Sequence, residues 1–252
     1  VTVEQAMAED ATPLHPDLRK DNVIVHSHLT MGPEDFTFEE GLREAEEKYG
    51  KENLVVLERE YHTPRISHCH IELPVSWAYQ EPGGKITVTS STQIPHIVRR
   101  VISQALGLPV GKIRVIKPYI GGGFGNKQEV LYEPLNAWLT TQVGGRCVRL
   151  DVSREETFQN TRSRHPISFD VAAAVDGDMR LMARSCTAVS NQGGYASHGH
   201  SIVANAVTGF RQLYLDRIGH HSTAYTVYTN RPAPGAMRGY GIPQCNFAVE
   251  CM

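Results

Sequence analysis

The chain has 252 residues, with 25 lysines and arginines against 27 aspartates and glutamates, for a formal net charge of -2. This length is enough for one large domain or two modest ones, with a core that needs no disulfide staples. A hydrophobic fraction of 40% and a charged fraction of 21% are ordinary for globular proteins and exclude a disordered or collagen-like chain. The near-neutral balance gives no general attraction to nucleic acid or to an anionic membrane, so we expect neither as a partner.

The cysteines indicate the cellular compartment, and the termini indicate whether the sequence is part of a longer protein. Five scattered cysteines, an odd number, are typical of reduced thiols, and we therefore expect a cytoplasmic protein. No apolar stretch approaches the roughly 20 residues of a membrane-spanning helix. Because the chain begins without Met and ends in an apolar run with the pattern of a helix start, residues 247–252, we expect it to be part of a longer protein.

The first half of the chain alternates predicted helices and strands after a polar start. Residues 1–35 are punctuated by proline, which favours an extended connecting arm. Apolar residues at helical spacing predict an amphipathic helix over 36–49, with Gly50 as its C-terminal cap. Strands are predicted at 53–61, 71–79 and 85–90, a helix at 94–108 and a short strand at 112–117.

The second half continues with the same mixture after a glycine-rich loop. Helical periodicity predicts helices at 129–143 and 201–208. Asp176-Gly177-Asp178 is typical of a hairpin turn. Strands are predicted at 146–152, 168–175, 179–189 and 222–228, the middle two forming the hairpin. Mixed strands and helices with a hairpin argue for an α+β fold or an irregular α/β fold, and we expect the α+β class.

The loop of residues 119–128 is the segment most typical of a ligand site. Four glycines surround Phe124 between a predicted strand and a predicted helix. Such a backbone can approach a ligand closely, and successive N–H groups near a helix start favour an anionic group. The spacing fits neither dinucleotide-binding nor P-loop fingerprints. A cofactor cradle is therefore predicted, with a tight structural turn as the alternative.

Two further segments combine polar side chains with turn residues. Arg238 and Tyr240 lie on a loop rich in proline and glycine, which suits an anion-binding guanidinium beside a stacking ring, although a surface loop would have the same composition. Residues 90–96 join a strand to a helix. There Ser91 or Thr92 could cap the helix, or Gln93 could direct its amide at a ligand.

Other catalytic patterns find little support. The histidines are partly clustered but lack the cysteine and histidine spacing of a zinc site. No G-x-S-x-G segment is present, so serine hydrolase chemistry is not indicated.

Five separated motifs carry a resemblance to a known family. They are STQIPH at 91–96, IGGGFGNKQ at 120–128, RSRHPI at 162–167, SNQGGYASHG at 190–199 and AMRGYGIPQ at 236–244. In this order and spacing they resemble the molybdenum-binding subunit of the xanthine dehydrogenase and aldehyde oxidase family, in particular bacterial xanthine dehydrogenase subunits with this GGGFGNKQ loop. The resemblance covers residues 61 to the end, and 36–61 resemble the family's preceding connecting segment.

The resemblance implies a domain and a cofactor. Residues 61–252 would form the first molybdopterin-binding domain, cut short at its C-terminus, and residues 1–60 a connecting arm and helix. The molybdenum would be held by the pterin dithiolene and by oxo, sulfido and hydroxo ligands, with no coordinating side chain, near Gln93, Phe124 and Arg238. The residues implied to bind the cofactor are Gln93, Gly122, Gly123, Phe124, Gly125 and Arg238, and those implied to bind substrate are Gln128, Asn205 and Tyr240.

Two of these positions depart from the purine-oxidising eukaryotic pattern. The family's substrate-orienting glutamate falls on Gln128 and its substrate-polarising arginine on Asn205. An amide cannot act as an acid or carry a guanidinium charge, so stabilising charge on a purine oxygen would need another donor. These departures argue against xanthine itself as the substrate.

The resemblance also implies a reaction and its partners. A purine or related N-heterocycle would be hydroxylated with oxygen from water, and electrons would pass to [2Fe-2S] clusters and FAD on partner subunits or domains. The catalytic base, a glutamate of a later G-x-G-E segment, would lie beyond Met252, so this chain would contain no catalytic residue and would be inactive alone. The alternatives are an aldehyde oxidase-type enzyme of the same superfamily, or a noncatalytic assembly module that binds a pterin or phosphate ligand.

Overall fold

The computed structural model describes residues 1–33, 35–212 and 214–252. The chain divides into two compact units, and each unit is made of more than one segment of the sequence. The first unit contains Val1–Ile66, Arg164–Pro234 and Gly239–Met252. The second unit contains Ser67–Ser163 and Gly235–Arg238.

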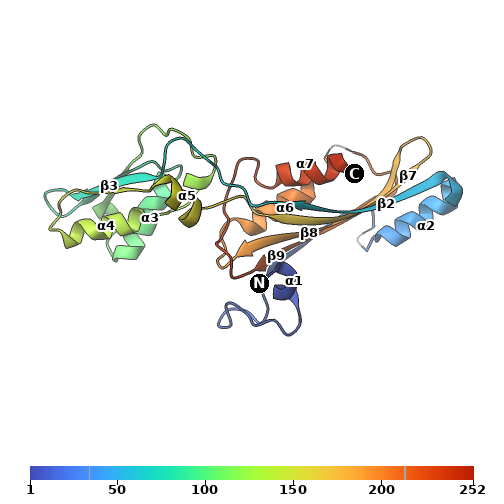
Figure 1. Cartoon of the computed structure of the whole chain (residues 1–252), viewed down its shortest axis with the longest axis horizontal. Helices are drawn as coiled ribbons and strands as arrows, with labels where there is room; N and C mark the ends of the chain where they lie inside the picture. The colour runs from blue at the N-terminus through green and yellow to red at the C-terminus, as the bar shows by residue number, and fades with distance from the viewer. Residues whose placement is uncertain (34, 213) are drawn as a thin grey trace. The chain divides into compact units, whose positions relative to one another are not determined.

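The first unit is built on a five-stranded sheet with the order β1-β9-β8-β7-β2 (Figure 1). Strands β8 and β9 run parallel, and the other neighbours run antiparallel. The strands are β1 (Val23–Met31), β2 (Leu54–Thr63), β7 (Ile167–Asp176), β8 (Leu181–Gly193) and β9 (Gly219–Tyr228). The helices of this unit are α1 (Val3–Met7), α2 (Phe38–Tyr49), α6 (Gly199–Gly209) and α7 (Ile242–Cys251), with a 3-10 turn at Lys51–Asn53.

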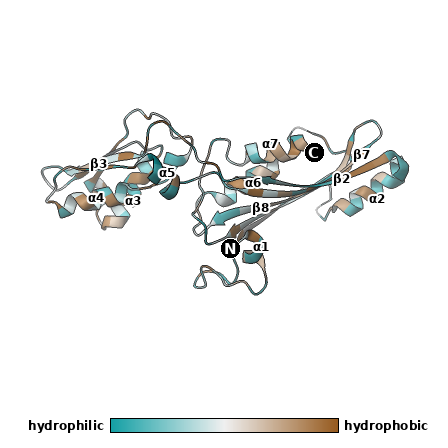
Figure 2. Ribbon diagram, viewed as in Figure 1, coloured by the Kyte–Doolittle hydropathy of each residue, from teal (hydrophilic) through white to brown (hydrophobic). Residues whose placement is uncertain are grey.

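Burial of alternate sheet residues explains how the helices attach to this sheet. Phe169 of β7 packs with Phe210, which follows α6, and with apolar residues of α6 and α7 in the main core of the unit. A smaller core places Phe38 and Ala45 of α2 against the far end of β7 and β8. Helix α2 accordingly carries both hydrophobic and hydrophilic residues (Figure 2).

The second unit contains a four-stranded sheet with the order β5-β4-β3-β6. Only β4 and β5 run parallel in it. Helices α3 and α4 pack against this sheet and each other around a core that includes Val88, Ile102 and Ala137 (Figure 1). The elements are β3 (Val75–Gln80), β4 (Ile86–Ser90), α3 (Pro95–Leu106), β5 (Ile113–Ile116), α4 (Glu133–Gln142), β6 (Val148–Asp151) and α5 (Arg154–Asn160), with 3-10 turns at Val110–Lys112 and Asn126–Gln128.

The predicted α+β class is confirmed, and most predicted elements are present. The extended arm expected over 1–35 is wrong in two places, because this segment contains the short helix α1 and the edge strand β1. Strand β1 mixes apolar and polar residues without a regular alternation, and it is held as a strand by antiparallel pairing with β9, from Val23 opposite Val227 to Met31 opposite His220. Helix α5 was not predicted, although Ser153 and Glu156 form a capping box at its start.

Two predicted boundaries also shift at prolines. The strand expected from residue 71 begins at Val75, directly after Pro74, whose nitrogen cannot donate to a sheet. The C-terminal helix, whose start was expected at residue 247, begins earlier, because α7 starts at Ile242 with Pro243 in its first turn. Within the described residues, none of the helices has both the length and the apolar character needed to cross a bilayer.

Candidate functional site

The glycine-rich loop leads from β5 into the 3-10 turn Asn126–Gln128 in the second unit. Gly122 and Gly125 have φ angles of +108° and +107°, a left-handed conformation that side chains with a Cβ rarely adopt. The loop closes on itself, since the Asn126 N–H donates to the Gly123 carbonyl (2.9 Å) and the Gln128 N–H to the Gly125 carbonyl (3.0 Å). These hydrogen bonds therefore hold the loop in a defined conformation in which the chain reverses its direction.

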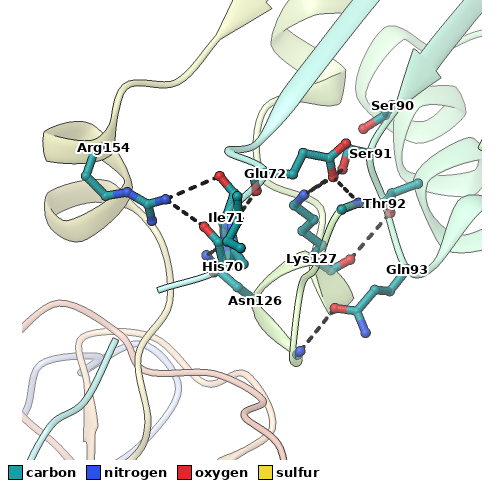
Figure 3. A network of polar contacts seen from close by, with 12 residues as sticks. His70, Ile71, Glu72, Ser90, Ser91, Thr92, Gln93, Asn126, Lys127 and Arg154 are labelled. Atoms are coloured by element: carbon teal, nitrogen blue, oxygen red, sulfur yellow. Dashed lines mark hydrogen bonds and ion pairs between the residues drawn. The ribbon is translucent and has the colours of Figure 1, made fainter. Parts of the chain in front are cut away.

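Gln93 lies against this loop, just before α3, and its side-chain amide has a fixed orientation (Figure 3). The Gly125 N–H donates to Gln93 Oε1 over 3.1 Å. A Cβ at Gly123 would lie only 2.6 Å from the same oxygen, so the close approach requires glycine there. Because Oε1 is the acceptor for the loop, the Gln93 NH₂ group is available as a donor.

The loop also presents backbone donors. Within the part of the chain that the structure describes, the N–H groups of Gly122, Gly123 and Phe124 donate no hydrogen bond to the protein. Consecutive N–H groups of this kind form a concave site for anionic oxygens. Together with the Gln93 amide, they form a cluster of donors without an opposing carboxylate in the loop itself.

The segment 235–238 lies beside the loop in the same unit. The Arg238 N–H donates to the Phe124 carbonyl over 2.8 Å, and the Gly235 N–H donates to the Ser163 carbonyl over 3.0 Å. His68 Nε2 bonds the Ala236 carbonyl at 2.7 Å. These contacts bring the backbone of Arg238 to the glycine-rich loop, and its side chain is exposed.

The three predicted substrate residues divide between the units. Gln128 is half-buried at the end of the 3-10 turn in the second unit. In the first unit, Asn205 of α6 donates from Nδ2 to the Tyr240 carbonyl (3.3 Å), and the Tyr240 hydroxyl bonds His198 Nδ1 (2.6 Å). The structure thus joins Asn205 with Tyr240, and joins Gln93, the loop and Arg238.

A buried polar network behind the loop was missed by the sequence analysis (Figure 3). Lys127 Nζ lies 2.5 Å from Glu72 Oε2 and 2.6 Å from Ser91 Oγ, and Lys127 is only 2% exposed. Asn126 Nδ2 is 2.8 Å from His70 Nε2, and His70 Nδ1 is 2.6 Å from the Glu72 carbonyl. The available signal was a lysine directly after the loop, but its partners are distant in sequence.

The charges of this network respond to burial and to hydrogen bonds. Burial acts to raise the pKa of Glu72, but hydrogen bonds from Lys127, Ser91 and Gly121 outweigh it and hold that pKa below its ordinary value. Burial lowers the pKa of Lys127 despite the Glu72 hydrogen bond, and burial also lowers the pKa of His70. Glu72 is therefore a carboxylate at neutral pH. Among the described residues, no group of three or more histidine, cysteine, aspartate or glutamate side chains is arranged to hold a metal ion.

Comparison with known proteins identifies the family. Residues 19–252 match the molybdopterin cofactor-binding domain. The chain is 44% identical over its whole length to the xanthine dehydrogenase molybdenum-binding subunit of Escherichia coli O157:H7, of which it spans 31%. It is 32% identical over 99% of its length to the nicotinate dehydrogenase large molybdopterin subunit of Eubacterium barkeri, spanning 55% of that protein.

Solved structures agree with this assignment. Aldehyde oxidoreductase from Desulfovibrio gigas superimposes with a TM-score of 0.84 and 27% identity, covering 99% of this chain and 26% of that one. Aldehyde oxidoreductase from Desulfovibrio desulfuricans gives a TM-score of 0.85 and 26% identity, covering 99% of this chain and 26% of that one. The family predicted from the five motifs is confirmed: the chain belongs to the molybdopterin cofactor-binding domain family.

Proposed function

We propose that this chain is the first cofactor-binding part of a molybdenum hydroxylase that oxidises a purine or related N-heterocycle with oxygen from water. The observation that carries the proposal is the glycine-rich loop, whose three open N–H groups lie beside a Gln93 amide oriented by Gly125. The similarity to xanthine dehydrogenase and nicotinate dehydrogenase subunits supports the reaction class. Because the chain spans only part of these relatives, the activity belongs to the larger enzyme.

The residues present fit a molybdopterin. When bound, this group supplies the metal centre at which a substrate carbon is hydroxylated. The N–H groups of Gly122, Gly123 and Phe124 would hold its anionic oxygens, and the Gln93 NH₂ group would donate a hydrogen bond to it. The Arg238 guanidinium pairs with its charged groups. A Cβ at Gly123 would displace the Gln93 side chain, so glycine at this position keeps the amide beside the loop.

Substrate recognition is assigned to Tyr240, Gln128 and Asn205. The Tyr240 ring stacks on a flat heterocycle, and its hydroxyl is held by His198 at 2.6 Å. Gln128 and Asn205 are neutral amides, so they cannot provide the charge that would polarise a purine oxygen. The second candidate is an aldehyde oxidised by the same chemistry, and the structural likeness to aldehyde oxidoreductase supports it.

The rest of the enzyme supplies what this chain lacks. We assign the glutamate base to the remaining molybdenum-binding half, and the [2Fe-2S] clusters and FAD that receive the electrons to partner subunits or domains. The work of such an enzyme on soluble small heterocycles is consistent with a cytoplasmic location. A module that binds a pterin without redox work is the alternative that metal analysis would reveal.

The cofactor assignment is tested in the full-length enzyme with its partners. Gln93→Ala and Arg238→Ala each remove a protein side chain that donates hydrogen bonds to the bound group. We expect the molybdenum-to-protein ratio to fall by about tenfold or more in each variant. Arg100→Ala, on an exposed position of α3, is the matched control and retains the metal. Normal molybdenum and pterin content in both site variants would contradict the assignment of these residues.

The substrate is tested separately, by measuring kcat/KM of the same enzyme with a panel of purines, nicotinate and aldehydes. Preference for a heterocycle supports the leading proposal, and preference for aldehydes supports the second candidate. A purified complex with an intact partner set but no molybdenum or pterin would overturn both in favour of a binding module.

A further inference from the structure

A largely buried polar cluster in the second unit is hydrogen-bonded to the glycine-rich loop (Figure 3). We call Glu72, Ser91 and Lys127 the Glu72 cluster. One oxygen, Glu72 Oε2, accepts from Lys127 Nζ at 2.5 Å, from the Gly121 N–H at 3.0 Å and from the Ser91 hydroxyl. Lys127 and Ser91 are 2% and 5% exposed, whereas the Glu72 side chain is 29% exposed, so the lysine and the serine are buried and the carboxylate is half-buried.

The cluster reaches both ends of the loop and Gln93. At the first end, Gly121 is bound twice to Glu72, by its N–H to the carboxylate and by its carbonyl to the Glu72 N–H (3.2 Å). At the second end, the Lys127 carbonyl accepts the Gln93 N–H over 2.8 Å. Gln93 Oε1 in turn accepts the Gly125 N–H. The hydrogen bonds thus connect the cluster, the two ends of the loop and Gln93.

Stability alone does not explain this ion pair, in which Lys127 is buried and Glu72 is half-buried. Removing two charges from water is costly, and well-packed apolar residues of similar volume are often equally stabilising. An apolar pair, however, could not accept the Gly121 N–H. The Glu72 carboxylate accepts this N–H, and the hydrogen bond from Lys127 keeps the half-buried carboxylate charged and oriented.

We propose that the Glu72 cluster positions the glycine-rich loop and Gln93 for cofactor binding, with Lys127 as its central group. Lys127 is a positioning residue, since it acts through the backbone of the loop and through Gln93. The inference rests on the proposed function, because the position of the loop matters for a cofactor only where a cofactor binds.

The test uses the full-length enzyme with its partners and three variants: Lys127→Met, Glu72→Met and the double Glu72→Met/Lys127→Met. The matched control is Glu133→Gln, a buried carboxylate of the same unit that accepts from Ser90 (2.8 Å) and from the N–H groups of Leu131 and Tyr132. The measurements are molybdenum and pterin per protein, the midpoint of thermal unfolding, and deuterium uptake of peptides spanning residues 119–128.

Each single variant leaves one charge of the pair without its partner, buried for Lys127 and half-buried for Glu72. We therefore expect a lower thermal midpoint, most of all for Glu72→Met, with faster exchange in the loop and about tenfold or more loss of molybdenum in both. The double variant has no unpaired charge and regains much of the midpoint, but it still lacks the acceptor for Gly121. We therefore expect it to remain fast-exchanging in the loop and poor in molybdenum, while Glu133→Gln keeps wild-type metal content.

A double variant that regains its midpoint and carries wild-type molybdenum would overturn the inference, because the cluster would then serve stability alone. If no methionine variant folds, Ser91→Ala decides the question, because it removes one hydroxyl and leaves the charges paired. Unchanged loop exchange and metal content in this variant would overturn the inference. Faster loop exchange with loss of metal would support it. A wild-type enzyme without molybdenum and pterin would instead contradict the proposed function, and loop exchange in the variants would still test the positioning.

Discussion

His220 is a buried histidine that the proposed mechanism does not use. It lies on β9 in the first unit, with its ring stacked 6.2 Å from that of Phe210 and its Nε2 bonded to the Ser222 hydroxyl. Burial is the main cause that lowers the pKa of His220 to about 3, and the neighbouring charges of Arg184, His221 and Arg211 act in the same direction. The folded protein therefore holds this ring neutral.

This pKa predicts a pH dependence of stability. The unfolded chain protonates His220 near its ordinary pKa of 6.5, whereas the folded protein does so only near 3, so the unfolded state binds more protons between these values. The contribution of His220 to stability is complete above pH 6.5 and is lost as the pH falls toward 3. We expect His220→Asn to reduce the slope of unfolding free energy against pH in this window by up to ~1.4 kcal/mol per pH unit.

The measurement is urea unfolding at a series of pH values between 3 and 7. His96→Asn, at an exposed position of α3, is the control and leaves the slope unchanged. Equal slopes for wild type and His220→Asn would show that His220 does not titrate as its burial requires.

At the scale of elements, the glycine-rich loop depends on a backbone that carries no Cβ at Gly125. This residue has a φ of +107°, and an added Cβ would lie 2.5 Å from the carbonyl oxygen of Ala236. The obstacle is backbone, which cannot move aside as a flexible side chain can. We therefore expect Gly125→Ala to lower the free energy of unfolding by about 1–3 kcal/mol and to weaken cofactor retention.

Urea unfolding with a matched glycine checks this prediction. Gly111 lies in the 3-10 turn after α3, has no positive φ and has open space around its Cβ position, so Gly111→Ala should be neutral or slightly stabilising. If Gly125→Ala proved as stable as Gly111→Ala, the loop would have to relax without loss, contrary to its packing.

Elements with strong local patterns were predictable from the sequence, and elements that depend on a partner were not. The hairpin of β7 and β8 follows from Asp176-Gly177-Asp178, and α2 from its apolar stripe and Gly50. Strand β1 lacks a clear alternation, and its extended form comes from pairing with β9. Helix α5 has only seven residues, too few for a convincing period.

Some residues of the candidate site were likewise predictable from the sequence and others were not. The glycine loop, Gln93 and Arg238 stood out because their residue types are distinctive where they occur. The Glu72 cluster did not, because Glu72, Ser91 and Lys127 come from separate segments, and a single glutamate or serine carries no pattern. The division into domains 1–60 and 61–252 and the roles of Gln128, Asn205 and Tyr240 stay predictions.

At the scale of the whole molecule, the chain has separate hydrophobic cores in its two units. Ile102 of α3 is fully buried in the core of the second unit, and Ile202 of α6 in the main core of the first. Truncating either isoleucine to alanine leaves a cavity, at an expected cost of about 2–5 kcal/mol. We expect Ile102→Ala to accelerate amide exchange in α3, β4 and β5, and Ile202→Ala in α6 and β9.

Hydrogen exchange with mass spectrometry of the two variants measures this pattern, and each variant serves as the other's control. The same set of peptides opening in both variants would mean that the cores unfold as one cooperative unit. Distinct sets would support two local stability units.

By itself, the sequence determined the α+β mixture, the glycine-rich loop and the ordered motifs that identify the family, because these depend on neighbours along the chain. The tertiary structure alone decided that Lys127 pairs with Glu72, that the Gln93 oxygen faces Gly125, and that the Arg238 backbone bonds to Phe124. The physical reason is that such contacts join segments far apart in sequence. Packing of the second unit's sheet and helices brings those segments together, and no local preference encodes the outcome.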